Sequence, residues 1–326
     1  IRDTSAQGIG KITGGNTDNG GGLYIKEGRV LLCSGNISGN TAYLGGGVYV
    51  SGGGTFVMSG GAVTDNEAKG SSEGGGGIYV FSTGTVSIQG GEVAYNKAHN
   101  GGGIYGYARS SLEVGVNGKI TNNTAENCGG GIKGDTATIK GTISQNTADL
   151  GGGLYINGNA TLVGAKITQN TASSAGGGLY VMGDEGHIYD VYLKDGTDIT
   201  ANAGGGVCAA YCKVHLGDEG TNDTVVVKEN LDYDLGLSMD SSTLNSKIFS
   251  AYTLSEDSQI GICVPGMEDS YTIIDSGNYA QGNLSKLFCD KGGYCLALGD
   301  GTSVVMTKGI ASYAAIPDEY NGKPLL

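Results

Sequence analysis

Several residue types that many proteins depend on are rare or absent in this chain of 326 residues. It has no Trp, four Phe, three Pro and three His. Lys and Arg together number 19 against 32 Asp and Glu, a formal net charge of −13 at pH 7. Because nucleic acids and anionic membranes attract basic surfaces, this balance argues against both as partners. No apolar run approaches the length of a membrane-spanning helix, so we expect no membrane insertion.

Helical segments and metal-binding motifs are also lacking. The chain contains 64 Gly, and each Gly inside a helix costs roughly 1 kcal/mol relative to Ala. The seven Cys and three His do not have the spacing of metal ligands, so we predict neither a metal site nor a cofactor. Disulfides Cys208–Cys212 and Cys289–Cys295 fit the spacing, but a stacked fold does not need them.

What the chain has in abundance is a repeated glycine cluster. Three Gly, an aliphatic residue and, in most copies, Tyr recur eight times, with the last Gly of each copy 25, 30, 26, 28, 22, 25 and 28 residues apart. These last glycines are Gly22, Gly47, Gly77, Gly103, Gly131, Gly153, Gly178 and Gly206. A period of this length is typical of proteins built by stacking copies of one supersecondary unit.

A second motif, an aliphatic residue followed three positions later by Asn, recurs in phase with the glycines. Its Asn residues are Asn40, Asn66, Asn96, Asn123, Asn146, Asn170 and Asn202. We place each Asn at a turn, where its side chain can bond to backbone groups and where left-handed backbone geometry is tolerated. Equivalent Asn side chains on stacked coils can form a ladder of amide hydrogen bonds.

Each repeat also holds short apolar segments that alternate or are β-branched, which indicates strands. Three strands per turn predict an all-β fold, a right-handed parallel β-helix, with about eight coils in residues 1–216. A leucine-rich repeat has a similar period but needs a helical half, and a calcium β-roll needs regular Asp; we disfavour both. Disorder, the other reading of a Gly-rich acidic chain, conflicts with the repeated aliphatic positions.

The period fades after residue 216, but strand-like pieces continue. They are residues 224–227, 260–264, 271–274, 295–298 and 303–306. We expect residues 217–312 to be irregular β coils and hairpins that continue or cap the β-helix, including a hairpin formed by 287–289 and 295–296. Residues 313–326 are expected to be a linker to a further module.

The candidate binding surface is a row of Tyr. In Val48-Tyr49-Val50 the aliphatic residues should point into the bore and Tyr outward. The row consists of Tyr24, Tyr49, Tyr79, Tyr105, Tyr155 and Tyr180, with Lys133 and Cys208 interrupting it. Such a row can stack sugar rings or anchor a protein partner. It can equally stabilise the strands by packing on itself, and the two roles are compatible.

No set of catalytic residues emerges from the repeats. Glycoside hydrolysis needs two carboxylates across a groove, yet no acidic pair recurs in register among Glu92, Glu113, Asp149, Asp184, Glu185 and Asp190. Lys119, Lys133, Lys140 and Lys166 fall in turn or outward positions without acidic partners in phase, and His99, His187 and His215 are isolated. Asn16-Thr17-Asp18 resembles the Asn-Thr-Asp of polygalacturonases, but the repeat aligns Asp18 with Ala42. We therefore predict no catalytic residue.

Together the glycine and Asn motifs resemble the repeats of chlamydial polymorphic membrane proteins, with Gly in place of Ala and Ile or Val in place of Phe. The Asn-Thr-Ala and Gly-Gly-Gly-Ile-Tyr forms are more similar to Gly-rich β-helix regions in large surface proteins of gut Gram-positive bacteria. This resemblance covers residues 8–216, and residues 317–324 resemble the start of a small β-sandwich repeat. It implies a pectate-lyase-like adhesin segment that is secreted or displayed on the cell surface.

The expected function is thus that of a non-catalytic, monomeric adhesin stalk, or of a module that binds a glycan or a host surface protein. The alternatives are a carbohydrate-active β-helix enzyme, either a polysaccharide lyase or a glycoside hydrolase, and a spacer with no ligand. Loops 69–74 and 183–191 interrupt the period, and we expect binding specificity to lie there.

Overall fold

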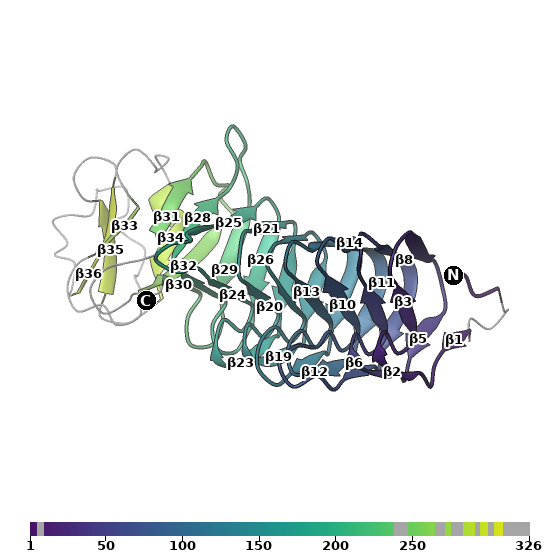
Figure 1. The fold of residues 1–326 in the computed structure, drawn as a ribbon. Helices are drawn as coiled ribbons and strands as arrows, with labels where there is room; N and C mark the ends of the chain where they lie inside the picture. The colour runs from purple at the N-terminus through teal and green to yellow at the C-terminus, as the bar shows by residue number, and fades with distance from the viewer. Residues whose placement is uncertain are drawn as a thin grey trace.

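The computed structural model describes residues 1–4, 10–237, 247–264, 271–274, 283–290, 294–298 and 303–308. The chain is all-β, with parallel sheets stacked into a solenoid of about 10 turns (Figure 1). The parallel β-helix is therefore confirmed, and it has more turns than the eight glycine copies suggested. In the described residues the one helix is the 3₁₀ segment η1 (Asn283–Lys286). The alternative fold, a leucine-rich repeat, is therefore wrong, because it needs a helical half in each repeat.

Each coil is made of three parts that pair in parallel with the same parts of its neighbours. The strands that form the first part of successive coils are β3 (Leu23–Ile25), β7 (Val48–Val50), β10 (Ile78–Phe81), β13 (Ile104–Tyr107), β16 (Ile132–Gly134), β20 (Leu154–Ile156), β24 (Leu179–Met182), β27 (Val207–Ala210) and β30 (Leu235–Leu237). Their register is regular: Tyr79 pairs with Tyr49 on one side and with Tyr105 on the other.

The second part of a coil is one long bent strand or two short ones. The long ones are β8 (Thr55–Thr64), β11 (Thr85–Ala94) and β14 (Ser111–Thr121). The divided ones are β4 (Arg29–Leu32) with β5 (Asn36–Ser38), β17 (Ala137–Ile139) with β18 (Thr142–Ser144), β21 (Ala160–Val163) with β22 (Lys166–Thr168), β25 (Tyr189–Lys194) with β26 (Thr197–Thr200), and β28 (Cys212–Leu216) with β29 (Val225–Lys228). β1 (Lys11–Ile12) pairs with β5.

A separate seven-stranded sheet forms the third part. Its strands are β2 (Asn16–Asn19), β6 (Thr41–Leu44), β9 (Glu67–Ala68), β12 (Lys97–Ala98), β15 (Thr124–Ala125), β19 (Thr147–Leu150) and β23 (Thr171–Ala175). The first pairing corrects the sequence alignment: Thr17 pairs with Ala42 and Asn19 with Leu44. Asp18 therefore lies one position later than predicted, at the position of Tyr43.

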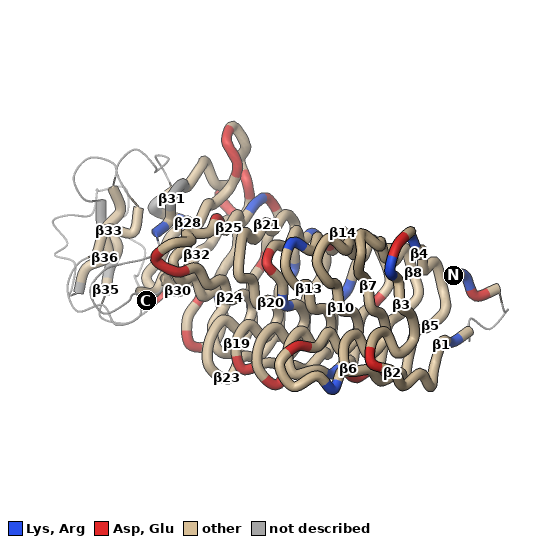
Figure 2. Tube along the Cα trace, viewed as in Figure 1, with Lys and Arg blue, Asp and Glu red and all other residues tan. Residues whose placement is uncertain are grey.

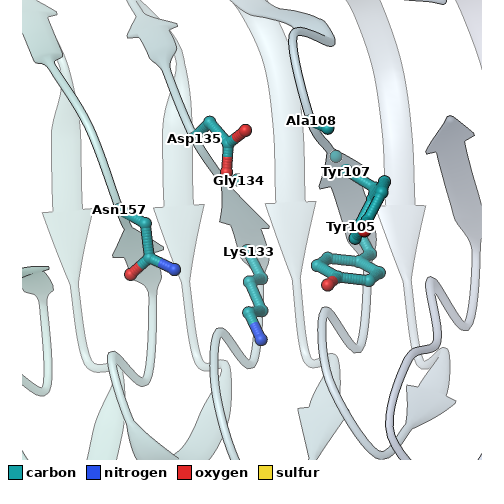
Figure 3. A pocket seen from close by; sticks show the side chains of 8 residues that line it. Tyr105, Tyr107, Ala108, Lys133, Gly134, Asp135 and Asn157 are labelled. Atoms are coloured by element: carbon teal, nitrogen blue, oxygen red, sulfur yellow. The ribbon is translucent and has the colours of Figure 1, made fainter. Parts of the chain in front are cut away.

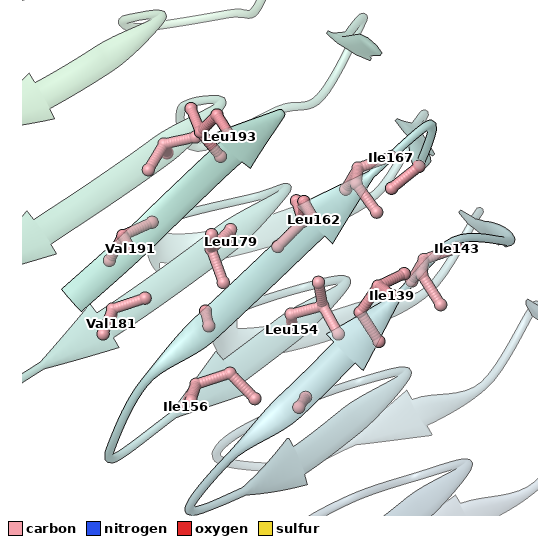
Figure 4. Packing of buried hydrophobic residues seen from close by; sticks show 14 of the residues in the cluster. Ile139, Ile143, Leu154, Ile156, Leu162, Ile167, Leu179, Val181, Val191 and Leu193 are labelled. Carbon is pink, nitrogen blue, oxygen red and sulfur yellow. The ribbon is translucent and has the colours of Figure 1, made fainter. Parts of the chain in front are cut away.

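The bore is filled by aliphatic side chains from the inward positions of these strands, such as Ile139, Leu154 and Leu162 (Figure 4). These three are fully buried. Burying one such side chain contributes about 1.5–3 kcal/mol. Since every coil adds several, the core grows with each repeat and needs no helix or disulfide.

The seven Asn form one continuous ladder inside the coil. Asn96 is typical: its Nδ2 donates to Asn123 Oδ1 at 3.0 Å and to the Val63 carbonyl at 2.9 Å. Its Oδ1 accepts from Asn66 N and Nδ2, both at 3.0 Å. The left-handed residue of each turn is the one before the ladder position, for example Tyr95 with φ 55°. The ladder Asn themselves do not use the left-handed geometry that Asn tolerates, and their buried side chains make the bonds of the ladder.

The ladder continues one rung beyond Asn202. Asn202 Nδ2 donates to Asn230 Oδ1 at 2.8 Å, and Asn230 donates from N and Nδ2 to Asp234 Oδ1, both at 2.9 Å. Asp234 is 2% exposed and its backbone N donates to Asp290. Burial and then the charge of Asp234 raise the pKa of Asp290 to about 6. Two carboxyl groups thus close the ladder.

The glycine cluster makes the corner before each first strand. Gly75 has φ +69°, and a Cβ on Gly76 would lie 2.5 Å from the carbonyl oxygen of Gly102 on the next coil. The first Gly therefore provides a turn that L-residues rarely adopt, and the second allows two coils to approach.

Beyond residue 237, β31 (Lys247–Ala251), β32 (Gln259–Cys263) and β34 (Leu287–Cys289) continue the parallel pairing. β33 (Tyr271–Ile274) pairs in parallel with β31 and antiparallel with β36 (Val304–Lys308), and β35 (Tyr294–Leu298) pairs antiparallel with β36. No pairing between the strands of the expected hairpin, 287–289 and 295–296, is found in the described residues; β34 pairs with β32 and β35 with β36. The predicted linker 313–326 lies outside the described residues.

Among the six Cys whose side chains the structure describes, no disulfide is found; they are Cys33, Cys128, Cys208, Cys212, Cys263 and Cys289. The Cys208–Cys212 bridge considered from the spacing is therefore not formed, and the side chain of Cys295 lies outside what the structure describes. Cys212 is buried and Cys208 half-buried, and burial raises the pKa of their thiols to about 12 and about 11.

In the described residues no helix has the length and apolar character needed to cross a membrane.

Candidate functional site

The Tyr row lies outside the bore, as the alternation predicts, but most of it is covered. Tyr79 is fully buried, and Tyr49, Tyr105 and Tyr155 are 7–9% exposed. Tyr180 is half-buried, and Tyr24, at the end of the row, is 56% exposed. The rings pack on one another: Tyr49 and Tyr79 stack with centroids 5.3 Å apart, and Tyr155 and Tyr180 stack at 5.2 Å.

Loop 69–74 supplies part of this cover. Glu73 Oε2 accepts a hydrogen bond from the Tyr79 hydroxyl at 2.5 Å, and Leu44 packs against the same Tyr cluster. Burial, followed by this bond, raises the pKa of Tyr79 far above its ordinary value. A ligand therefore has little ring face to reach between Tyr49 and Tyr105, and the row packs as a stabilising stack there.

Lys133 replaces Tyr in the row without breaking it. Its Nζ lies 5.0 Å from the centroid of Tyr105 and 5.7 Å from that of Tyr155, and burial lowers its pKa. A cation over aromatic faces on two neighbouring coils is a favourable substitute for a ring.

At the second interruption of the row, Tyr233 lies beside Cys208, and its hydroxyl accepts a hydrogen bond from Gly176 N at 3.0 Å. Sequence reading missed Tyr233 because it is out of register with the other Tyr.

On five successive coils, the outward position two residues beyond the Tyr row is exposed or half-buried. We call these five positions the strand-end row: Phe81, Tyr107, Asp135, Asn157 and Met182. Phe81 pairs with Tyr107, and the strands carrying the others are in register on successive coils. Phe81 and Tyr107 are 40% and 39% exposed and stack at 5.5 Å with an interplanar angle of 5°.

Next to this aromatic pair the surface is hollowed. A pocket of about 240 Å³ is lined by Tyr105, Gly106, Tyr107, Ala108, Lys133, Gly134, Asp135 and Asn157. Figure 3 shows Asp135 and Asn157 at one side of it, while the Lys133 amine points away from both. The pocket thus combines one aromatic wall, glycine at its floor, a carboxylate and an amide. The aromatic pair and the pocket beside it have no counterpart in the repeat motif, so the sequence analysis did not predict them.

The turn after β13 adds to the unusual character of this region. Ala108 and Arg109 have φ 31° and 58°, both in the left-handed region. The equivalent turn two coils earlier uses Gly52 and Gly53. The hydroxyl of Ser110 is buried without a hydrogen-bond partner. Backbone in this region costs of order 1–3 kcal/mol per residue and is often found at binding sites.

Five of the six acidic residues considered for catalysis have nearby partners that account for them. Glu113 faces Lys140 at 3.8 Å, so the prediction that the lysines lack acidic partners was wrong. Thr121 donates to Glu92 at 2.5 Å, and Ser173 and Ser174 donate to Asp149. Figure 2 shows charged positions of both signs spread along the rod. No group of three His, Cys, Asp or Glu in the described residues is arranged to hold a metal ion.

The three His are not isolated, contrary to the sequence prediction. His99 contacts Glu126 at 3.0 Å and His187 contacts Asp184 at 3.0 Å within loop 183–191. His215, which is 6% exposed, contacts Asp190 at 2.8 Å and stacks on Tyr192 at 4.4 Å. The His99 and His215 pairs join neighbouring coils, and the His187 pair closes a turn within its own loop.

No family model, curated protein or solved structure matches this chain. The function must therefore be argued from the surface itself. In the part of the chain that the structure describes, the strand-end row with its pocket is where exposed aromatic rings and convergent polar groups meet. Among the eight residues lining the pocket, Asp135 is the one carboxylate, which does not meet the two-carboxylate requirement of glycoside hydrolysis.

Proposed function

We propose that this chain is a non-catalytic segment of an extracellular bacterial surface protein, which acts as a rigid stalk and binds glycan through the strand-end row. The observation that carries the binding proposal is the exposed Phe81–Tyr107 stack directly beside a pocket lined by Asp135 and Asn157. Aromatic rings offer flat apolar faces to the C–H face of a sugar, and a few placed polar groups then select its hydroxyls.

The stalk proposal has separate support. A solenoid of about 10 turns, with coils spaced roughly 4.8 Å apart, is a long body whose core is continuous from coil to coil. The motifs shared with bacterial surface repeats, in particular the Asn-Thr-Ala and Gly-Gly-Gly-Ile-Tyr forms, favour an extracellular setting. Such a body can hold a binding site away from an attachment point.

The test is a glycan array probed with residues 1–326, with bound glycans checked for cleavage. We expect binding without cleavage, and we expect the double variant Phe81→Ala/Tyr107→Ala to lose it. The matched control is Tyr43→Ala/Tyr95→Ala, which removes two rings that are 52% and 56% exposed elsewhere on the rod. Cleavage would favour a carbohydrate-active enzyme, and binding that survives the Phe81/Tyr107 change would refute the site.

A further inference from the structure

The orientation of the aromatic pair determines what the pocket can accept. The rings of Phe81 and Tyr107 are nearly parallel and belong to neighbouring coils. Phe81 covers one face of Tyr107. Tyr107 lines the pocket and Phe81 does not, so the other face of Tyr107 forms the pocket wall. The stack therefore points along the rod towards the next coil.

On that next coil the row changes from rings to a short side chain. Lys133 pairs with Tyr105, so Asp135 occupies the position equivalent to Tyr107. A carboxylate is much smaller than a ring, and the following coil places Asn157 at the same position. The pocket is the space that a third ring of the stack would fill, between Tyr107 and Asn157.

The size of the space suits one sugar-sized ring of a ligand. Its volume of about 240 Å³ is below the range of roughly 300–1,000 Å³ that is usual for drug-sized ligands. Because the stack runs along the rod, a ring that continues it must enter from the side. An extended chain lying on the rod would cross the row without placing a ring parallel to Tyr107.

The polar lining determines the charge of that ring. Asp135 is half-buried at the edge of the space, and Asn157 is exposed opposite Tyr107. A carboxylate accepts hydrogen bonds and repels anions, while the Lys133 amine is directed to the rings of Tyr105 and Tyr155. The site thus favours a ring that donates from hydroxyl, amide or ammonium groups.

From these contacts we infer that the pocket takes a single terminal sugar residue, uncharged or amino-bearing, which inserts from the side as the third member of the Phe81–Tyr107 stack. This inference rests on the proposed glycan binding and narrows its ligand. The protein binds the terminal residues of glycans, and it does not bind internal segments or acidic sugars.

Two substitutions at one position test this inference. Asp135→Phe places a ring of the chain itself in the space, so it should abolish binding while the fold is kept. Asp135→Asn keeps the size but removes the charge, and loss of a charge-assisted bond should weaken binding about tenfold or more. Thr136→Phe is the control, because it adds the same ring at an exposed neighbouring position.

The measurement is binding to arrayed glycans grouped by terminal residue, with competition by free N-acetylglucosamine, glucosamine, mannose, galactose and glucuronic acid. We expect binding to follow the terminal residue, competition by a neutral or amino sugar, and no competition by glucuronic acid. Binding that depends on internal segments, is competed by glucuronic acid, or persists in Asp135→Phe would overturn this inference and leave glycan binding standing. No binding to any arrayed glycan would overturn both.

Discussion

The Tyr row and the strand-end row lie two residues apart on the same strands, yet they differ in every respect that matters for function. The Tyr row repeats one residue and is largely buried. The strand-end row changes from Phe to Tyr to Asp to Asn and is exposed or half-exposed. Where stacked coils repeat a residue, each copy satisfies its neighbours; where the residue changes, a gap opens that a ligand can fill. For these two rows we infer that repetition serves stability and that the change of residue in the strand-end row serves the proposed binding.

The largest effect should come from the most strictly repeated position, the Asn ladder. Asn96→Ala removes the acceptor of two Asn66 donors and the donor to the Val63 carbonyl, all buried. Each buried group left without a partner costs about 1–3 kcal/mol, so we expect a loss of at least about 3 kcal/mol in the free energy of unfolding. Chemical denaturation measures it. Asn117→Ala, at an exposed position on β14, is the control and should change stability by less than about 0.5 kcal/mol.

The Tyr row should come next. Tyr79 is fully buried between two rings and bonded to Glu73, so Tyr79→Ser should cost about 3–5 kcal/mol, as for other large aromatic truncations. Thermal unfolding measures it, with Tyr24→Ser as the control because Tyr24 is 56% exposed. If both variants were equally stable, the row would not be the stabilising stack described here.

The carboxyl pair at the end of the ladder should make stability depend on pH. The pKa of Asp290 is raised to about 6 in the folded protein, above its unfolded value of about 3.9. The folded state therefore favours the protonated form. The stabilisation is complete below about pH 4 and is lost as pH rises through about 6. Denaturation midpoints between pH 4 and 8 measure this change.

The variant Asp290→Asn sharpens that experiment. An amide cannot ionise but can donate to Asp234, so this part of the pH dependence should disappear while the fold is retained. A variant that keeps the full dependence would show that another group carries it.

A smaller effect is expected at the interruption of the Tyr row. Lys133→Tyr restores a ring between Tyr105 and Tyr155, and an aromatic pair contributes about 0.5–1.5 kcal/mol beyond its buried area. We expect a gain of that order, partly offset by the loss of the cation–ring contacts. Lys133→Ala, which restores nothing, should lower stability; a rise in both variants would contradict the account.

The repeated features of the fold could be predicted from the sequence, whereas the features found on one coil alone could not. The glycine clusters and the aliphatic-x-x-Asn motif predicted the parallel β-helix because every copy imposes the same backbone. Burial of the Tyr row could not be predicted, since it depends on how Glu73 and Leu44 lie over the rings. Asn230 fits the motif through Val227 and could have been found. The pocket could not, because it arises from one small residue, Asp135, in a row whose register only the structure gives.

We propose that the Tyr row stabilises the fold and that the strand-end row binds the ligand. The most direct measurement compares glycan-array binding and thermal unfolding for the wild type and for Phe81→Ala/Tyr107→Ala. We predict that the double variant unfolds within a few degrees of the wild type and no longer binds. A double variant that binds as well as the wild type, or that fails to fold, would contradict the assignment.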